Sequence, residues 1–126
     1  MEKRIITSSN APAPIGPYSQ AVLVNGTLYC SGQIAIDPAT GELVMDNIEQ
    51  ETVQVMKNIE AVLKEADMDL SHVVKASIFL SDMALFQQVN AVYGAYFKDD
   101  FPARETVAVK TLPKNVNVEI SVIAVK

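Results

Sequence analysis

Residues 48–66 repeat their apolar side chains with the period of an α-helix, and this segment lies between stretches that resemble β-strands. A helix with one apolar face must bury that face against another element. Asn47 and Gln50 resemble a capping box and predict that the helix begins there. The apolar residues of the pattern are Ile48, Val55, Met56, Ile59, Val62, Leu63 and Ala66. The chain therefore has to supply a sheet or a second helix for this face, which constrains the fold more than any other feature.

Strand-like segments surround this helix. Asn25-Gly26 separates two β-rich runs, residues 21–24 and 27–31, and is the strongest short signal for a hairpin. A short strand precedes the Pro-rich segment 11–17, which we interpret as a rigid loop. The remaining strands are expected over residues 73–80, 104–111 and 116–125.

A second helical pattern follows Ser81 and Asp82, either of which can cap it. Its apolar residues are Leu85, Phe86, Val89, Val92, Tyr93, Tyr96 and Phe97. The order is one strand, two strands, a helix, a strand, a helix and two strands. This order predicts an α+β fold in which both helices pack on one face of a sheet. With 126 residues, 49% of them hydrophobic, we expect one domain spanning residues 1–126.

The last strand also predicts what happens on the other face of the sheet. Alternation places Val118, Ile120 and Val122 on one face, and Glu119, Ile123 and others on the opposite face. If helices cover the first face, apolar side chains remain uncovered on the second. This favours association of subunits, although scattered apolar residues are also common on protein surfaces.

Composition excludes several classes of protein. The net charge of −5 argues against a nucleic-acid surface, which needs clustered Lys and Arg. A single cysteine, Cys30, allows no internal disulfide and favours a reducing compartment. The first residues lack the apolar core of a signal peptide, and no apolar run has the length of a membrane helix. We expect a cytoplasmic protein that binds neither nucleic acid nor membrane.

Two charged residues in apolar surroundings stand out, because charges are rarely placed there unless they are paired or used. Arg104 and Glu119 lie in the last two predicted strands. The simplest interpretation of their spacing is a cross-strand ion pair. The functional alternative is that the arginine binds a substrate carboxylate and the glutamate exchanges protons with a water molecule. Tyr18 is similarly open to two interpretations, a packing anchor or part of a ligand pocket. His72 has no partner at metal-ligand spacing, so no metal site is expected.

Several separated motifs, taken together, resemble the RidA/YjgF family of enamine and imine deaminases over nearly the whole chain. The motifs are residues 15–21 (IGPYSQA), 31–34 (SGQI), 37–41 (DPATG), 89–93 (VNAVY), and 102–104 (PAR) with 118–120 (VEI). The resemblance implies a chorismate-mutase-like fold of the bacillary type, assembled as a homotrimer with clefts between subunits. It also implies that Arg104 holds the substrate carboxylate and that Glu119 positions or activates water. The other residues that it places at the substrate are Tyr18, Ser31, Gly32, Asn90 and Thr106.

The activity that the resemblance implies is hydrolytic deamination of 2-imino and 2-enamino acids to 2-keto acids and ammonia. The substrates would be 2-aminoacrylate (2-iminopropanoate) and 2-iminobutanoate, which pyridoxal-phosphate dehydratases release from serine and threonine. No cofactor is required, because the imine is already activated. The alternative is a non-catalytic trimer that binds small carboxylates or acts as a chaperone or stress regulator. Ribonuclease activity is also attributed to the family, but the acidic charge and the single histidine argue against it here.

Two positions depart from the family pattern. Glu105 stands where the family usually has a small residue, and alternation predicts that it points away from the face of Arg104. Thr106 stands where many members have cysteine, so a hydroxyl replaces a thiol.

Overall fold

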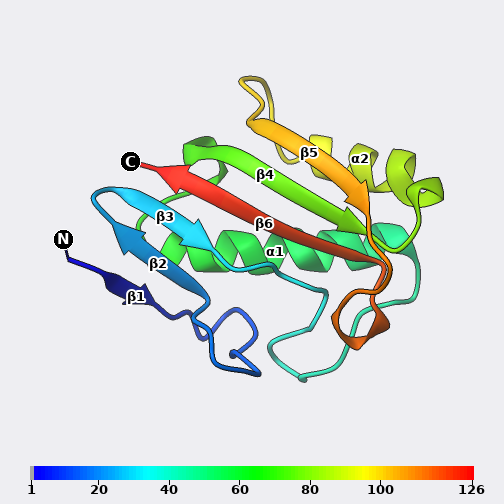
Figure 1. The fold of residues 1–126 in the computed structure, drawn as a ribbon, viewed down its shortest axis with the longest axis horizontal. Coiled ribbons are helices and arrows are strands. Elements are labelled where there is room, and N and C mark those ends of the chain that lie inside the picture. Colours follow the sequence, from blue (N-terminus) through cyan, green and yellow to red (C-terminus); the bar gives the residue numbers. More distant parts are fainter. Residues whose placement is uncertain (1) are drawn as a thin grey trace.

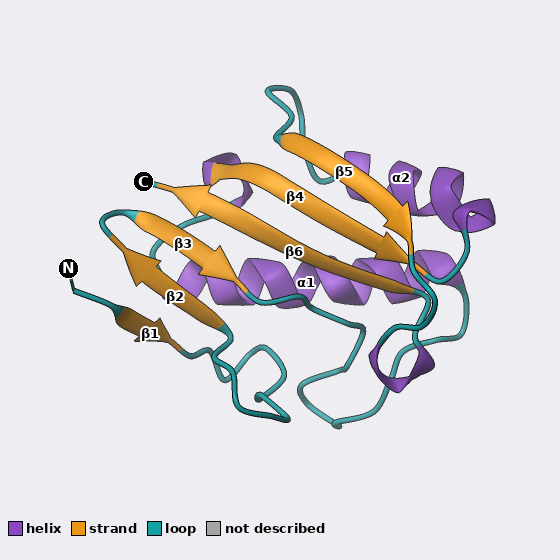
Figure 2. Ribbon diagram, in the orientation of Figure 1, coloured by secondary structure: helices purple, strands orange, loops and turns teal. Residues whose placement is uncertain are grey.

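The protein forms one six-stranded sheet with both helices on the same face (Figures 1 and 2). The computed structural model describes residues 2–126. The strands are β1 (Arg4–Ile6), β2 (Ala21–Val24), β3 (Thr27–Cys30), β4 (Val73–Leu80), β5 (Ala103–Ala108) and β6 (Val118–Val125). The helices are α1 (Ile48–Glu65) and α2 (Phe86–Gly94), and three single 3₁₀ turns cover Leu70–His72, Met83–Leu85 and Pro113–Asn115. The predicted α+β architecture is confirmed.

The strand order is β1-β2-β3-β6-β4-β5, so β6 lies between β3 and β4 and does not pair with β5. All neighbours are antiparallel except β4 and β5, which are parallel. Parallel neighbours need a crossover connection, and α2 supplies it. The crossover places β5 at the outer edge of the sheet, beyond β4. The last two strands of the chain are therefore separated in space.

The helix boundaries follow local capping chemistry. Asn47 caps α1 by accepting a hydrogen bond from the backbone N–H of Gln50 at 2.8 Å. Asp82 caps the 3₁₀ turn that leads into α2, where the side chain accepts from the N–H of Ala84. The predicted second helix extended to Phe97, but α2 ends at Gly94. Among the described residues, no helix combines the length and the apolar character that a membrane crossing would need.

The core lies between α1 and the helix-facing side of the sheet. Val55, Ile59 and Leu63 of α1 are fully buried, as are Val118 and Ile120 of β6. This confirms the face that alternation assigned to β6. Cys30 is also buried, and burial raises the pKa of its thiol to about 12. A thiol that stays protonated is unreactive, as expected for a core residue.

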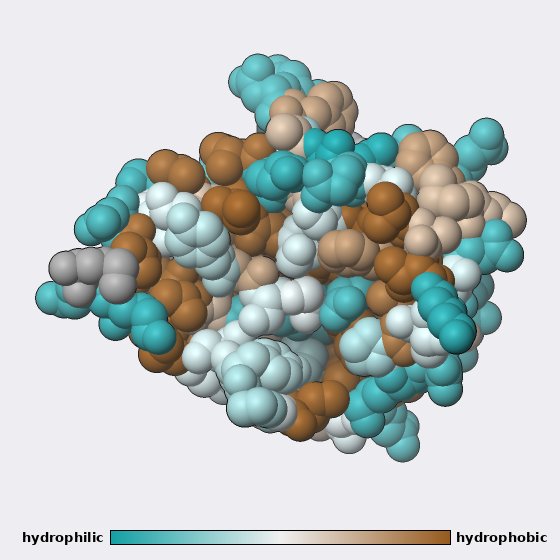
Figure 3. Space-filling model, viewed as in Figure 1, coloured by the Kyte–Doolittle hydropathy of each residue, from teal (hydrophilic) through white to brown (hydrophobic). Residues whose placement is uncertain are grey.

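Among residues 2–126, no helix covers the opposite face of the sheet, which faces the viewer in Figures 1 and 3. Brown hydrophobic patches interrupt its polar surface in Figure 3. Ile5, Tyr29, Val107 and Val125 are all more than 40% exposed there. Directly paired residues of neighbouring strands point to the same face of a sheet. Ile5 and Tyr29 therefore share one face, because both pair with Val22. The apolar uncovered face expected from the last strand is present.

Candidate functional site

Arg104 lies on β5 with its side chain held against α2. It pairs with Ala76 of β4, whose buried side chain lies on the helix side of the sheet. Its guanidinium donates a hydrogen bond from Nη1 to Oδ1 of Asn90 at 2.5 Å. The Cζ atom lies 5.2 Å from the ring centre of Tyr93 and 5.7 Å from that of Phe86. The cation–π contacts with the two rings and the hydrogen bond to Asn90 hold the guanidinium in place. None of these partners carries a negative charge that would neutralise that of Arg104.

The charge of Arg104 remains available for a ligand. Within residues 2–126, no carboxylate forms an ion pair with it. A guanidinium carries five N–H donors, and only Nη1 is engaged by Asn90. A hollow of about 330 Å³ opens beside it, lined in part by Tyr93, Phe101 and Pro102. A planar fork at the wall of such a hollow suits bidentate binding of a carboxylate.

Two hydroxyl groups near this arginine have no hydrogen-bond partner in the part of the chain that the structure describes. They are Oγ1 of Thr106 and the hydroxyl of Tyr93, and both atoms are buried. Thr106 follows Arg104 by two residues on β5 and pairs with Ile78, which places it on the same face as the arginine. Burial raises the pKa of the Tyr93 hydroxyl, while the nearby Arg104 charge acts in the opposite direction. Tyr93 is therefore a neutral donor at neutral pH.

Glu119 lies on β6 in a separate and smaller hollow of about 60 Å³. Tyr18, Gly32, Gln33 and Pro113 are among the residues that line it. The carboxylate lies so close to Gly32 that a Cβ atom there would be 2.7 Å from Oε2. Partial burial raises the pKa of the Glu119 carboxyl, and no described residue forms an ion pair with it. A carboxyl with a raised pKa can exchange protons near neutral pH.

The loop that carries Tyr18 is fixed by hydrogen bonds. The N–H of Ile15 donates to the Tyr18 hydroxyl at 3.3 Å. Ser31 donates its hydroxyl to the carbonyl of Ser19 at 2.6 Å, and its N–H to the carbonyl of Gln20 at 2.9 Å. Tyr18 and Gly32 border the Glu119 hollow, whereas the Ser31 hydroxyl holds the loop.

Arg104 and Glu119 do not form the cross-strand ion pair that was one interpretation of their spacing. β4 separates their strands, and the two side chains lie on opposite faces of the sheet. Arg104 is aligned with Ala76 and Val122 on the helix side, while Glu119 pairs with Phe79 on the uncovered side. Within one chain, the cationic and the acidic residues therefore belong to two different surfaces.

Glu105 points away from Arg104, as alternation predicted. It accepts a hydrogen bond from the Ser77 hydroxyl and forms an ion pair with Nζ of Lys75 at 3.0 Å. The Ser77 and Lys75 interactions lower the pKa of the Glu105 carboxyl. Glu105 is thus part of a polar ladder on the uncovered face and does not compete for the arginine.

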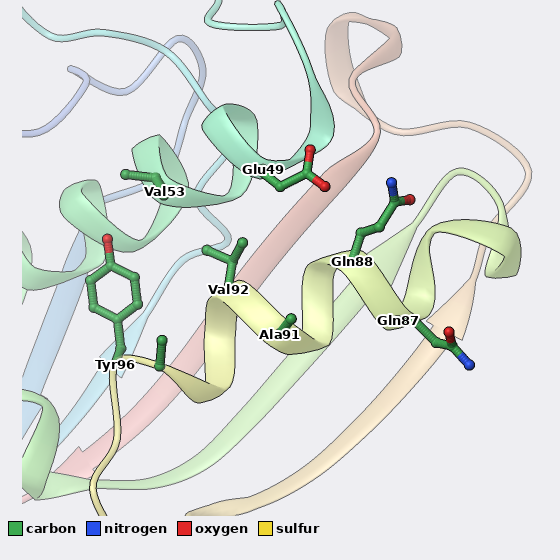
Figure 4. A pocket seen from close by; sticks show the side chains of 8 residues that line it. Glu49, Val53, Gln87, Gln88, Ala91, Val92 and Tyr96 are labelled. Carbon is green, nitrogen blue, oxygen red and sulfur yellow. The ribbon is translucent and has the colours of Figure 1, made fainter.

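A larger hollow lies elsewhere, between α1 and α2 (Figure 4). It measures about 580 Å³ and is lined mainly by aliphatic and amide side chains, with Glu49 at its edge. Val53 of α1 and Val92 and Tyr96, from α2 and the segment that follows it, line it from its two sides. None of the residues predicted at the substrate lines it.

The aromatic support of Arg104 was not predicted as part of the site. Phe86, Asn90 and Tyr93 are spaced by four and three residues, so they lie on one face of α2. The helical pattern contains this signal, but only the crossover connection shows that the same face meets β5.

Comparisons with known proteins show which family the chain belongs to. The family described as Endoribonuclease L-PSP matches residues 8–126. A goat (Capra hircus) protein named 2-iminobutanoate/2-iminopropanoate deaminase is 50% identical over 98% of this chain and 90% of its own length. A Lactococcus lactis protein named as a candidate regulator, AldR, is 53% identical over 96% of each chain. A solved structure of a Rid-family protein of unknown function, YyfA from Yersinia pestis, has a TM-score of 0.96 at 52% identity and covers 99% of this chain and 100% of its own. The chain therefore belongs to the Endoribonuclease L-PSP family, which is the RidA/YjgF family that its sequence motifs resemble.

Proposed function

We propose that this protein hydrolyses 2-imino acids, and their 2-enamino tautomers, to 2-keto acids and ammonia. The observation that carries the proposal is the guanidinium of Arg104, which is clamped by Asn90 and two aromatic rings yet has no carboxylate partner among the described residues. The relative from goat that is named 2-iminobutanoate/2-iminopropanoate deaminase supports the same substrate class.

In the proposed reaction, the fork of Arg104 binds the carboxylate of the imino acid and holds C2 in place. Water adds its oxygen to C2 while the imine nitrogen gains a proton. The resulting carbinolamine loses its hydroxyl proton, the C2–N bond breaks, and ammonia leaves from a 2-keto acid. In each of the two steps Glu119 accepts one proton from oxygen, first from the attacking water and then from the carbinolamine hydroxyl, and passes it to the nitrogen, a role for which its raised pKa is suited. An enamine first takes a proton at C3 to become the imine.

We further propose that each active site is shared between subunits of a homotrimer. Arg104 and Glu119 lie on opposite faces of one sheet, so one substrate can contact both only if they come from different chains. The uncovered face with Ile5, Tyr29 and Val125 offers the apolar area that such an assembly needs. Light scattering coupled to gel filtration tests this, and a monomer at assay concentration would contradict it.

The activity is tested by adding the purified protein to a threonine dehydratase reaction that contains semicarbazide. We expect faster appearance of the 2-keto acid and less semicarbazide adduct, and the same test with a serine dehydratase compares the two imines. Arg104→Lys should lose most of the effect, because the charge remains but the bidentate geometry is lost. Glu119→Gln should still bind a 2-keto acid but turn over slowly. No acceleration at any protein concentration would rule out the enzyme.

A second candidate function is capture of small carboxylates without turnover, as in a regulator. The name of the Lactococcus lactis relative favours it, and the Arg104 hollow alone would suffice for binding. Equal 2-keto acid affinity in the wild type and Glu119→Gln, with no deamination in either, would support this function.

A further inference from the structure

We infer that Glu51, a buried residue of α1 outside the predicted site, is a positioning residue that holds the start of β6 and through it the carboxylate of Glu119. This inference rests on the proposed function. Glu51 is fully buried. Its Oε2 accepts hydrogen bonds from the backbone N–H groups of Asn117 at 2.8 Å and Val118 at 3.2 Å, and its Oε1 accepts one from Nδ2 of Asn117 at 3.0 Å.

A second set of contacts completes the clamp from β4. Ser81 donates its hydroxyl to Oδ1 of Asn117 and its N–H to the carbonyl of Asn117, both at 3.0 Å. The two polar ends of the Asn117 side chain and both of its backbone groups are therefore engaged. Because β6 begins at Val118, this residue pair is where the backbone direction of the strand is set.

Glu119 is the next residue after Asn117 and Val118, and its carboxylate has little space in which to move. Gly32 already lies in contact with it, at a separation that leaves no space for a Cβ atom. Because Gly32 leaves no room for the Glu119 carboxylate to move inward, a shift or rotation of Asn117 and Val118 would withdraw it from the hollow. Misplacement by about 1 Å can cost roughly a hundredfold in rate. A fully buried carboxylate devoted to this one strand end is consistent with a need for accurate placement.

Two substitutions of Glu51 distinguish the effect of its hydrogen bonds from the effect of its side-chain volume. Glu51→Met keeps the length of the side chain but removes all three acceptor contacts, so we expect kcat to fall roughly 10- to 100-fold. Glu51→Gln keeps an oxygen for the two backbone N–H groups. Its new amide N–H can be accommodated if Asn117 turns its amide over, since the hydroxyl of Ser81 can accept as well as donate. We expect this variant to retain kcat within about threefold of wild type.

Two controls distinguish a loss of protein stability from a loss of the positioning of Glu119. Leu63→Ala removes a buried side chain near the other end of α1, away from the hydrogen bonds of Glu51, and destabilises the protein. It should leave kcat unchanged at temperatures well below its thermal midpoint. In a Glu119→Gln background, Glu51→Met should lower kcat by less than twofold further, because the group through which it acts is already gone. An equal fold loss in both backgrounds would overturn the inference.

A readout independent of activity is the titration of the Glu119 carboxyl, followed by ¹³C NMR of glutamate-labelled protein and assigned with Glu119→Gln. Within one chain, Tyr18 is the other titratable residue that lines this hollow, and burial is the cause of the raised Glu119 pKa; the proposed trimer would add the guanidinium of Arg104 from a neighbouring subunit. We expect the pKa of Glu119 to fall toward its ordinary value in Glu51→Met and to stay raised in Glu51→Gln. An unchanged pKa in Glu51→Met would overturn the positioning role even if the protein proved not to be a deaminase. Full turnover in Glu119→Gln would instead refute the proposed role of Glu119 and leave the NMR result to decide about Glu51.

Discussion

Gly32→Ala should disable the proposed reaction while leaving the fold intact. The added Cβ atom would lie 2.7 Å from Oε2, 2.8 Å from Cδ and 3.0 Å from Cγ of Glu119. Ordinary contacts of a Cβ atom begin at about 3.4 Å, so the carboxylate must move by roughly 0.7 Å. The clash is with the end of a flexible side chain, which yields more easily than the backbone. The methyl group is therefore expected to displace the acid and not the loop.

The size of the effect follows from that displacement. If a misplacement of about 1 Å costs roughly a hundredfold, a shift of about 0.7 Å should lower kcat by roughly 10- to 100-fold. Stability should change little, since Gly32 is not among the residues with positive φ. Replacing glycine by alanine at such a position gains about 0.4–1 kcal/mol through the unfolded chain, which offsets part of the crowding.

The assay is the semicarbazide competition with the imine from threonine dehydratase, run beside thermal unfolding. Binding of 2-oxobutanoate, followed by calorimetry, reports separately on the Arg104 half of the site and should remain within about threefold of wild type. In a Glu119→Gln background the substitution should have no further effect on kcat. Wild-type kcat in Gly32→Ala, at an unchanged thermal midpoint, would refute the assignment of Glu119 as the proton-transfer group.

Three further predictions follow from the same contacts. Asn90→Ala removes a hydrogen bond to the charged Arg104 and should weaken 2-keto acid binding about tenfold in calorimetry, with a smaller effect on kcat; unchanged affinity would count against the clamp. Because burial raises the pKa of Glu119 in the folded state, its ionisation destabilises the fold as pH rises through that pKa. Glu119→Gln should therefore raise the thermal midpoint at pH 7 but not at pH 4, and the opposite order would contradict the raised pKa. Glu105→Gln should leave kcat/KM within about twofold of wild type, because its carboxylate pairs with Lys75 on the other face; a large loss would mean that it reaches the substrate.

Local patterns were sufficient for most of the secondary structure. The helical period, the Asn47 cap and the Asn25-Gly26 turn act over a few residues, and the structure has α1 and the hairpin where they were expected. The pattern does not locate the end of a helix where the residues that follow the helix still pack against the core. Tyr96 and Phe97 follow the apolar pattern of α2 and contact the core, yet they lie beyond its last turn at Gly94. Apolar spacing alone does not distinguish these cases.

By itself, the sequence determined which residue types are available and on which side of each strand they lie, because alternation is a property of the backbone. Alternation therefore correctly predicted that Glu105 points away from Arg104 and that Ile120 lies on the face covered by a helix. Only the tertiary structure decided which strands are neighbours. The crossover through α2 inserts β4 between Arg104 and Glu119 and leaves them on opposite faces. Strand order depends on long-range packing and not on local spacing, which is why an apparent ion pair in the sequence became two separate surfaces in the fold.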